Sequence, residues 1–293
     1  LYSPQHEYTK ELISSLPQRL GRLEAGFSDV QEPLISVENL KVYFPVRKGL
    51  LQRHVDDIKA VDDVSFRIYP GRAMALVGES GSGKTTLGRA ILGLVQSTQG
   101  IVNYLDKDLT KLSRSEMKPI RRDLQIVFQD PQSSLNPRLT VATILIEPME
   151  AHGIGSGPAE RIKLAGETLN QVGLDASMLA RFPHEFSGGQ RQRIGIARAL
   201  VLNPRFIVCD EVTSALDVRV QAQVLKLLDK LRHQFDLTYL FISHNIEVVK
   251  YFCDDITVMH NGKIVEEGRT LEVCRDPAHA YTKRLLEAVP KFE

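Results

Sequence analysis

Apolar positions along the chain follow strand spacing and helix spacing in alternation. Predicted strands, each built around a short apolar run, occupy 73–77, 124–128, 205–211 and 238–244, and the stretch 218–235 has apolar residues at helical spacing. Short, continuous apolar runs are typical of strands that are buried on both faces. Strands that alternate with helices predict an α/β fold with a mainly parallel sheet.

The first part of the chain after residue 34 shows a different pattern. Residues 35–44 and 61–68 alternate apolar and polar positions, which predicts two strands. The segment 45–59 between them is rich in basic residues and is predicted to be an exposed loop. These basic residues are Arg47, Lys48, Arg53 and His54.

Two later segments add helices and a hairpin. Residues 130–203 contain helical stretches broken by prolines and by a glycine-rich turn, which predicts a helical insertion. Asn261-Gly262 lies between apolar runs at 256–260 and 263–267, and this dipeptide predicts a tight hairpin turn.

Composition narrows the class of protein. The 293 residues are 43% hydrophobic, and 37 Lys and Arg balance 36 Asp and Glu, so the charge gives no support to nucleic-acid binding. No apolar run approaches the ~20 residues of a membrane-spanning helix, and no charged-then-apolar leader opens the chain. Cys209, Cys253 and Cys274 are scattered, which suits reduced thiols. We therefore expect a soluble intracellular protein.

The stretch from Gly78 to Thr85 fits the phosphate-loop pattern G-x-x-x-x-G-K-[ST] at every fixed position. A predicted strand precedes it and helical spacing over 86–94 follows, which is the context of a functional phosphate loop. Backbone N–H groups of such a loop surround phosphate oxygens, and the helix presents its positive end to them. We expect Lys84 to reach the β- and γ-phosphates and the Thr85 hydroxyl to ligate Mg²⁺. The predicted nucleotide-binding residues of the loop are Gly78, Glu79, Ser80, Gly81, Ser82, Gly83, Lys84, Thr85 and Thr86.

A pair of carboxylates follows the apolar run 206–209. Asp210 is placed to hold the Mg²⁺ shell, and Glu211 would stand beside the γ-phosphate and polarise the attacking water. By itself an apolar run followed by Asp-Glu is a weak signal, because most such pairs are strand ends that meet solvent. In a chain that also has a phosphate loop, the pair predicts ATP hydrolysis.

The box Ser187-Gly188-Gly189-Gln190 precedes a helical stretch and predicts a second anion-binding helix start, with Ser187 as its cap. One nucleotide does not need two such sites within one domain. At this point the sequence resembles the ATP-binding cassette (ABC) family, whose signature is this Ser-Gly-Gly-Gln box.

Further motifs of that family are present in order. By themselves Phe44 would be a core strand residue and His244 a strand-end histidine, but the resemblance gives both a role at the nucleotide. The matching residues are Gln129 for the Q-loop, Ser214-Ala215-Leu216-Asp217 for the D-loop, His244 for the switch histidine and Phe44 for the aromatic that stacks on adenine. Phe186 stands where leucine is usual and Val212 where proline or alanine is common, but neither departure removes a chemical group.

The resemblance implies a P-loop NTPase fold, namely an ABC nucleotide-binding domain with a mainly parallel core sheet, an antiparallel β subdomain and a helical insertion. It implies ATP and Mg²⁺ as cofactors, with Glu211, His244 and Gln129 as catalytic residues and Thr85, Gln129 and Asp210 as magnesium ligands. In that family the signature box of one domain closes over the ATP of another. The implied partners are therefore a second ABC domain and two permease subunits, with no nucleic acid.

The subfamily can be narrowed by two segments. Residues 128–141, with Glu147-Pro148 beyond them, resemble the oligopeptide, dipeptide and nickel importers. The tail resembles them in Asp276-Pro277-x-His279-x-Tyr281-Thr282, although Ala280 replaces the usual proline. Where those importers often have a cysteine cluster, this chain has only Cys274, so an iron–sulfur cluster is not expected.

Part of that tail motif occurs twice, at one constant offset along the chain. We interpret residues 1–20 as the C-terminal remnant of a preceding homologous ABC domain, 21–33 as a linker, 34–275 as the ABC ATPase domain with its helical subdomain at about 130–203, and 276–293 as the tail. The alternative is a shared helix-start pattern, with Ser3 and Asp276 as caps. The recurring residues are Pro4, His6, Tyr8, Thr9, Lys10, Leu12 and Pro17, matched by Pro277, His279, Tyr281, Thr282, Lys283, Leu285 and Pro290.

The predicted function is ATP-driven peptide import at the cytoplasmic face of a bacterial inner membrane, with a solute-binding protein as an indirect partner. The tandem arrangement resembles fused peptide-importer ATPases, including those for antibiotics of the microcin C type. Nickel or another small solute stays open as the cargo, since the cargo is selected by proteins absent from this chain. A non-transport ABC ATPase of translation or DNA repair would need a basic insertion. A regulatory module without turnover would lack Glu211 or His244, and both are present.

Overall fold

The computed structural model describes residues 32–48, 53–214 and 216–288. These residues fall into two units. We call the described residues of 21–117 and 238–293 the P-loop unit, and residues 118–237 the signature unit. The recurring segment at residues 1–20 and the linker at 21–31 lie outside the described residues.

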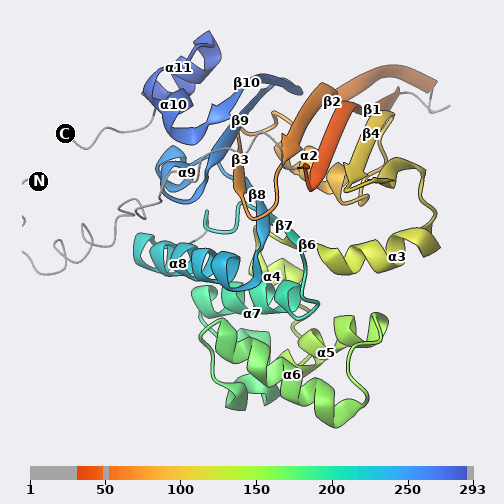
Figure 1. The fold of residues 1–293 in the computed structure, drawn as a ribbon, viewed down its shortest axis with the longest axis vertical. Helices are drawn as coiled ribbons and strands as arrows, with labels where there is room; N and C mark the ends of the chain where they lie inside the picture. Colours follow the sequence, from red (N-terminus) through yellow and green to blue (C-terminus); the bar gives the residue numbers. More distant parts are fainter. Residues whose placement is uncertain (1–31, 49–52, 215, 289–293) are drawn as a thin grey trace, which may run out of the picture. The chain divides into compact units, whose positions relative to one another are not determined.

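An antiparallel sheet of the P-loop unit contains β1 (Ile35–Lys48), β2 (Arg53–Ile68), β4 (Gln99–Tyr104) and β5 (Lys107–Asp108), in the order β2-β1-β4-β5 (Figure 1). The predicted exposed loop over 45–59 is strand at 45–48 and 53–59, so the loop was wrong, whereas the exposure of this segment is confirmed where its side chains are described. Strands β1 and β2 stay paired beyond the sheet core, with Pro45 opposite Asp57. Val55 and Ile58 are 55% and 60% exposed. Because this part of the hairpin buries no continuous face, the sequence gives it no apolar alternation.

The second sheet of the P-loop unit is built around β3 (Ala73–Val77), whose five residues are all buried. Strand β3 pairs in parallel with β8 (Thr238–Ile242) and with β9 (Asp255–His260). Strand β10 (Lys263–Arg269) returns antiparallel to β9, so the predicted hairpin at Asn261-Gly262 is confirmed.

Helices of the P-loop unit follow the strands. They are α2 (Lys84–Ile91), α9 (Ile246–Phe252), α10 (Thr270–Arg275) and α11 (Ala280–Glu287). The alternative that made Asp276 a helix cap before Pro277 is wrong for this end of the chain. Helix α11 is capped by His279, and Asp276 instead follows the last residue of α10.

The signature unit is mainly helical, as the spacing over 130–203 predicted. Strand β6 (Leu124–Val127) pairs in parallel with β7 (Phe206–Asp210). Helices α5, α6 and α7 pack against one another (Figure 1). The helices are α4 (Pro131–Ser134), α5 (Val141–Ala151), α6 (Pro158–Gln171), α7 (Gly188–Leu200) and α8 (Val218–Phe235), and α3 (Arg114–Asp123) leads into β6.

The boundaries of α8 coincide with the predicted helix, because its cap is local. The Asp217 carboxylate accepts a hydrogen bond from Val220 N–H at 2.9 Å, and the helix ends at Asp236 in a left-handed conformation. None of the helices in the described ranges has the length and apolar character needed to span a membrane.

Candidate functional site

The phosphate loop leaves the buried end of β3 and is enclosed by backbone. Gly78 and Gly83 have φ angles of +152° and +105°. A Cβ at Gly78 would lie 2.1 Å from the carbonyl oxygen of Met259, and one at Gly83 would lie 1.9 Å from that of Ala60. Only glycine permits these two approaches, so the loop is pressed between β9 and β2.

Lys84, the first residue of α2, is 5% exposed and points into the loop. Its ammonium donates to the carbonyl oxygens of Gly78 at 2.8 Å and Glu79 at 2.7 Å, and to Ser82 Oγ at 3.4 Å. The loop therefore closes around a cation at the N-terminal end of a helix, where anionic groups are favoured. Thr85 and Thr86 follow in the first turn of α2.

One further backbone contact and one side chain hold the loop, and a second backbone contact fixes the turn that provides the first. Gly262 N–H donates to the Ser82 carbonyl at 3.0 Å, and Asp62 N–H donates to the Gly262 carbonyl at 2.8 Å. Glu79 N–H donates to the hydroxyl of Tyr281 at 2.9 Å. Sequence reasoning assigned Tyr281 only to a tail motif, and its recurrence was the signal that could have marked it as functional.

Phe44 and His244 take exposed positions in the P-loop unit. Phe44 lies on β1 opposite Ile58, and its side chain is 42% exposed. His244 is exposed two residues after β8, and Asn245 beside it caps α9 by accepting from Glu247 N–H at 3.0 Å. An exposed ring on β1 suits contact with a planar ligand better than the core role that Phe44 would have by itself.

The predicted carboxylate pair lies at the end of β7 in the signature unit. Asp210 is 3% exposed, and Glu211 has a left-handed φ of +48°. The side chain of Gln129 donates through Nε2 to Glu211 Oε2 at 3.1 Å. Two of the predicted catalytic residues are thus brought together from positions far apart in the sequence.

A non-glycine residue with left-handed φ is uncommon and clusters at functional sites. The backbone of Glu211 is held in this conformation by Ser214, whose N–H and hydroxyl both donate to the Glu211 carbonyl, at 3.1 and 2.9 Å. Of the D-loop residues, Ser214 therefore supports Glu211, and Asp217 caps α8. Leu216 is half-buried, and Ala215 lies outside the described residues.

The signature box begins α7 as a capping box. Ser187 Oγ accepts from Gln190 N–H at 3.3 Å, and the Gln190 side chain accepts from Ser187 N–H at 3.0 Å. A Cβ at Gly188 would meet no atom of the chain within 4 Å, whereas one at Gly189 would lie 2.4 Å from the Val220 side chain. The first glycine of the box therefore faces open space, and the second one packs on α8.

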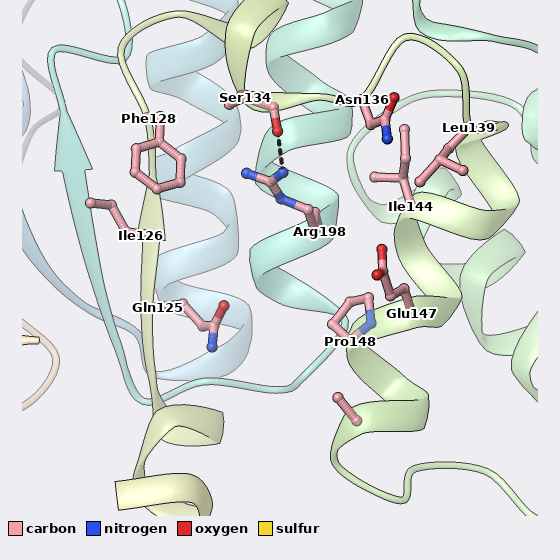
Figure 2. A pocket seen from close by; sticks show the side chains of 11 residues that line it. Gln125, Ile126, Phe128, Ser134, Asn136, Leu139, Ile144, Glu147, Pro148 and Arg198 are labelled. Carbon is pink, nitrogen blue, oxygen red and sulfur yellow. Dashed lines mark hydrogen bonds between the residues drawn. The ribbon is translucent and has the colours of Figure 1, made fainter. Parts of the chain in front are cut away.

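A pocket of about 520 Å³ lies beside the Q-loop within the signature unit (Figure 2). The Arg198 guanidinium on α7 donates to the Ser134 carbonyl at 2.5 Å and lies 5.9 Å from the centre of the Phe128 ring. Burial lowers the pKa of Arg198, and the Glu147 carboxylate opposes this shift. Sequence reasoning missed Arg198, since one arginine on a helix gives no signal.

Comparison with known protein families agrees with these observations. Residues 61–214 match the model described as ABC transporter. The chain belongs to the ABC transporter family. Residues 265–293 of this ABC transporter chain also match the oligopeptide/dipeptide transporter C-terminal region, which confirms the subfamily resemblance.

Two similar proteins are both named as ATP-binding proteins of transport systems. A peptidoglycan transport ATP-binding protein of Agrobacterium fabrum is 45% identical over 99% of the chain and 52% of its own length. An oligopeptide transport ATP-binding protein of Bacillus subtilis is 48% identical over 89% of the chain and 79% of its own length. The chain thus spans about half the length of the Agrobacterium relative.

Among solved structures, a dimeric ATP-binding cassette named MJ0796, bound to ADP and Pi in a post-hydrolysis state, is 30% identical with a TM-score of 0.70. The match covers 80% of the chain and 98% of that structure. The predicted fold class, an ABC nucleotide-binding domain, is confirmed.

Proposed function

We propose that this chain is the ATP-hydrolysing subunit of an importer for peptides. The observation that carries the proposal is the glycine-enclosed loop around the Lys84 ammonium, which the carbonyl oxygens of Gly78 and Glu79 hold at 2.8 and 2.7 Å. These carbonyls stand in for the phosphate oxygens that the ammonium would contact in the nucleotide complex. A polyphosphate of ATP size fits this donor set of amides and one buried cation.

Each predicted residue then has a role in binding. The backbone amides of 80–86 bind phosphate oxygens, and Lys84 exchanges its two carbonyl partners for β- and γ-oxygens. Phe44 stacks on adenine. Bound Mg²⁺ would supply charge neutralisation, and the residues that would hold it are Thr85, Gln129 and Asp210.

Hydrolysis depends on how the chain holds a water and its proton. Glu211 orients the attacking water, and the Gln129 amide, which donates to Glu211 Oε2 at 3.1 Å, keeps this carboxylate in place. His244 donates a hydrogen bond to the γ-phosphate and so favours the charge that develops in the transition state.

The open signature box points to a second ABC domain as the partner. Gly188 faces open space at the N-terminal end of α7, and this end of a helix favours an anion. We infer that this box completes the nucleotide site of a facing domain. That domain is a homologous N-terminal half of the same protein, or a second copy of this chain when the half is missing.

The tail and the relatives support peptides as the cargo. Residues 265–293 match the oligopeptide/dipeptide transporter C-terminal region, and one relative is named for oligopeptide transport. The signature unit would then contact two permease subunits at the cytoplasmic face of the membrane, with Gln129 linking that contact to the nucleotide. A solute-binding protein outside the membrane would deliver the peptide, and nickel or another small solute is the alternative cargo.

Two substitutions test the ATPase assignment. Glu211→Gln should leave ATP binding intact and reduce hydrolysis by roughly 10²-fold, because the charge that orients water is removed. Lys84→Ala should instead weaken ATP binding in an equilibrium titration. Glu167→Gln, at an exposed residue of α6, is the matched control and should leave both properties unchanged. Normal turnover in Glu211→Gln would refute the assignment.

The partner is tested with the same variant. ATP that bridges two domains should produce a dimer of Glu211→Gln chains that dissociates when nucleotide is removed. Sedimentation with and without MgATP measures this, and the wild-type ATPase rate should rise more than linearly with protein concentration. A dimer that is indifferent to nucleotide would contradict the proposal that ATP bridges two ABC domains.

A further inference from the structure

The recurring tail motif forms the start of α11 and is anchored within the P-loop unit. His279 caps the helix, since its Nδ1 accepts from Tyr281 N–H at 3.1 Å. On β10 the Glu266 carboxylate accepts from the N–H groups of Ala278 at 2.7 Å and His279 at 3.1 Å. The motif thereby fixes the position of its tyrosine.

Tyr281 fills the space between the end of β9 and the phosphate loop. Its side chain is 2% exposed, and its ring stacks on His260 with centroids 3.9 Å apart and an interplanar angle of 30°. His260 is the last residue of β9, next to Met259, whose carbonyl crowds Gly78. The ring contact therefore holds the hydroxyl at the beginning of the loop.

The tyrosine hydroxyl and Lys84 hold the two ends of one peptide group. The Gly78 carbonyl accepts from Lys84 Nζ at 2.8 Å, and the N–H of the same peptide, at Glu79, donates to Tyr281 Oη at 2.9 Å. Glu79 precedes the amides of 80–86 that bind phosphate in the proposed function. Its N–H is thus outside the phosphate-binding set and has a protein partner of its own.

We propose that Tyr281 is a positioning residue that fixes the Gly78–Glu79 peptide so that the phosphate loop keeps its shape when Lys84 turns to the nucleotide. The proposal rests on the proposed function only in taking ATP as the ligand. Lys84 must exchange the Gly78 carbonyl for phosphate oxygens, and from then on Tyr281 is the remaining side-chain partner of that peptide in the contacts described above. The C-terminal tail is in this way part of the nucleotide site.

The role accounts for the residue types of the motif. A histidine caps the helix, a tyrosine reaches the loop, and Thr282 in the first turn of α11 is buried. Recurrence of the same types at His6, Tyr8 and Thr9 is what this role predicts if another phosphate loop belongs to the preceding domain.

Tyr281→Phe tests the proposal because it removes the hydroxyl and keeps the ring on His260. Without this hydroxyl the nucleotide-free phosphate loop is less ordered, and part of the free energy of nucleotide binding is then used to order it. A single neutral hydrogen bond corresponds to a loss of about 2- to 10-fold in affinity. Since the loss applies equally to the bound ground state and the transition state, the KM for ATP should rise by that factor and kcat should change by less than about twofold.

The experiment uses the full chain and two measurements. MgADP titration gives the Kd, and hydrogen–deuterium exchange without nucleotide reports the Glu79 N–H, which should exchange faster in Tyr281→Phe. Tyr239→Phe removes the hydroxyl of a buried tyrosine on β8, whose backbone lies opposite Ala73 at the other end of β3. Lys283→Ala changes an exposed residue of α11. Both controls should retain the wild-type Kd and exchange rate.

Each outcome decides the question. An unchanged Kd together with unchanged Glu79 exchange would overturn the proposal. So would a fall in kcat at constant KM with a lower melting temperature, since that result marks a general loss of folded protein. If the wild-type chain itself fails to bind MgADP, the proposed function is wrong, while the exchange measurement still shows whether Tyr281 holds the loop.

Discussion

The phosphate loop and the signature box both lead into a helix and both offer its N-terminal end to an anion, yet they are built differently. At the phosphate loop, backbone carbonyls of Met259 and Ala60 approach so closely that a Cβ at Gly78 or Gly83 would lie within about 2.1 Å of them. At the signature box the order comes from two side chains, those of Ser187 and Gln190, and Gly188 has open space around it.

This difference separates a site that its own unit encloses from one that is left open. The phosphate loop is held by backbone atoms and by Tyr281 and Lys84, so its shape is determined before any ligand binds. The signature box is ordered by its own helix turn and by the packing of Gly189 on α8, and the face of Gly188 is open. An added Cβ should therefore not be tolerated at Gly78 or Gly83 of the phosphate loop, whereas one at Gly188 of the signature box should be.

Alanine at one glycine of each site gives the largest expected effect. Gly83→Ala forces a side chain into a left-handed backbone 1.9 Å from the Ala60 carbonyl. It should destabilise the chain by roughly 2–4 kcal/mol and abolish MgADP binding. Gly188→Ala should leave the melting temperature unchanged or slightly raised, because alanine favours a helix over glycine by up to ~1 kcal/mol.

Thermal unfolding and nucleotide titration of the two variants measure this contrast. Equal losses in both would show that the signature box is as enclosed as the phosphate loop. A folded Gly83→Ala chain with normal MgADP affinity would show that the close approach of Ala60 is unimportant.

A smaller effect is expected at the far end of α7, where the signature helix is tied by a side chain. Arg198→Met removes the bond to the Ser134 carbonyl and leaves that oxygen without the guanidinium. The charge-assisted bond implies a loss of about 1.5–3 kcal/mol in the free energy of unfolding. Arg198→Lys should lose less because it keeps a charged donor.

Urea unfolding monitored by circular dichroism measures the change, and Arg138→Met, at an exposed arginine of the same unit, is the control. A wild-type midpoint in Arg198→Met would show that the Q-loop segment is held by other contacts, and that the two sites differ less than described.

Much of the fold was accessible from the sequence because buried strands and capped helices have local signals. The runs that became β3, β7 and β8 are apolar except for Asp210 at the end of β7 and Thr238 at the start of β8, and α8 carries its own cap at Asp217. Strand β4 was missed because only two of its six residues, Val102 and Tyr104, are buried. The extension of β1 and β2 was missed because it covers no core.

The site was predictable where a motif fixes chemistry and unpredictable where tertiary contacts do. Lys84 and Glu211 could be named from their neighbours in sequence. Tyr281 and Arg198 act through Glu79 and Ser134, which are distant in the chain, and no periodicity reports such a contact. Which glycine of the signature box faces open space, as Gly188 does, likewise depends on tertiary packing and cannot be predicted from the motif.

The smallest expected effect concerns the anchor of α11 and its response to acid. Burial favours the protonated form of Glu266, but the hydrogen bonds that its carboxylate accepts, including those from Ala278 and His279, outweigh this and lower the pKa of Glu266 below its usual 4.5. A carboxylate with a lowered pKa in the folded state stabilises that state above pH 4.5, and the contribution is lost as the pH falls through the folded-state pKa. The enclosed phosphate loop should thus become easier to open in acid, because the helix that carries Tyr281 loses its anchor.

Glu266→Gln should remove this part of the pH dependence, while Glu287→Gln, at the exposed end of α11, should keep it. The melting temperature measured between pH 3.5 and 7 should show a difference between wild type and Glu266→Gln that shrinks below pH 4.5. The difference is expected to be small because the carboxylate is only partly buried and water screens its charge. A constant difference over the whole range would mean that the ionised carboxylate does not anchor α11, and the tail would then hold the phosphate loop through the Tyr281 ring and hydroxyl alone.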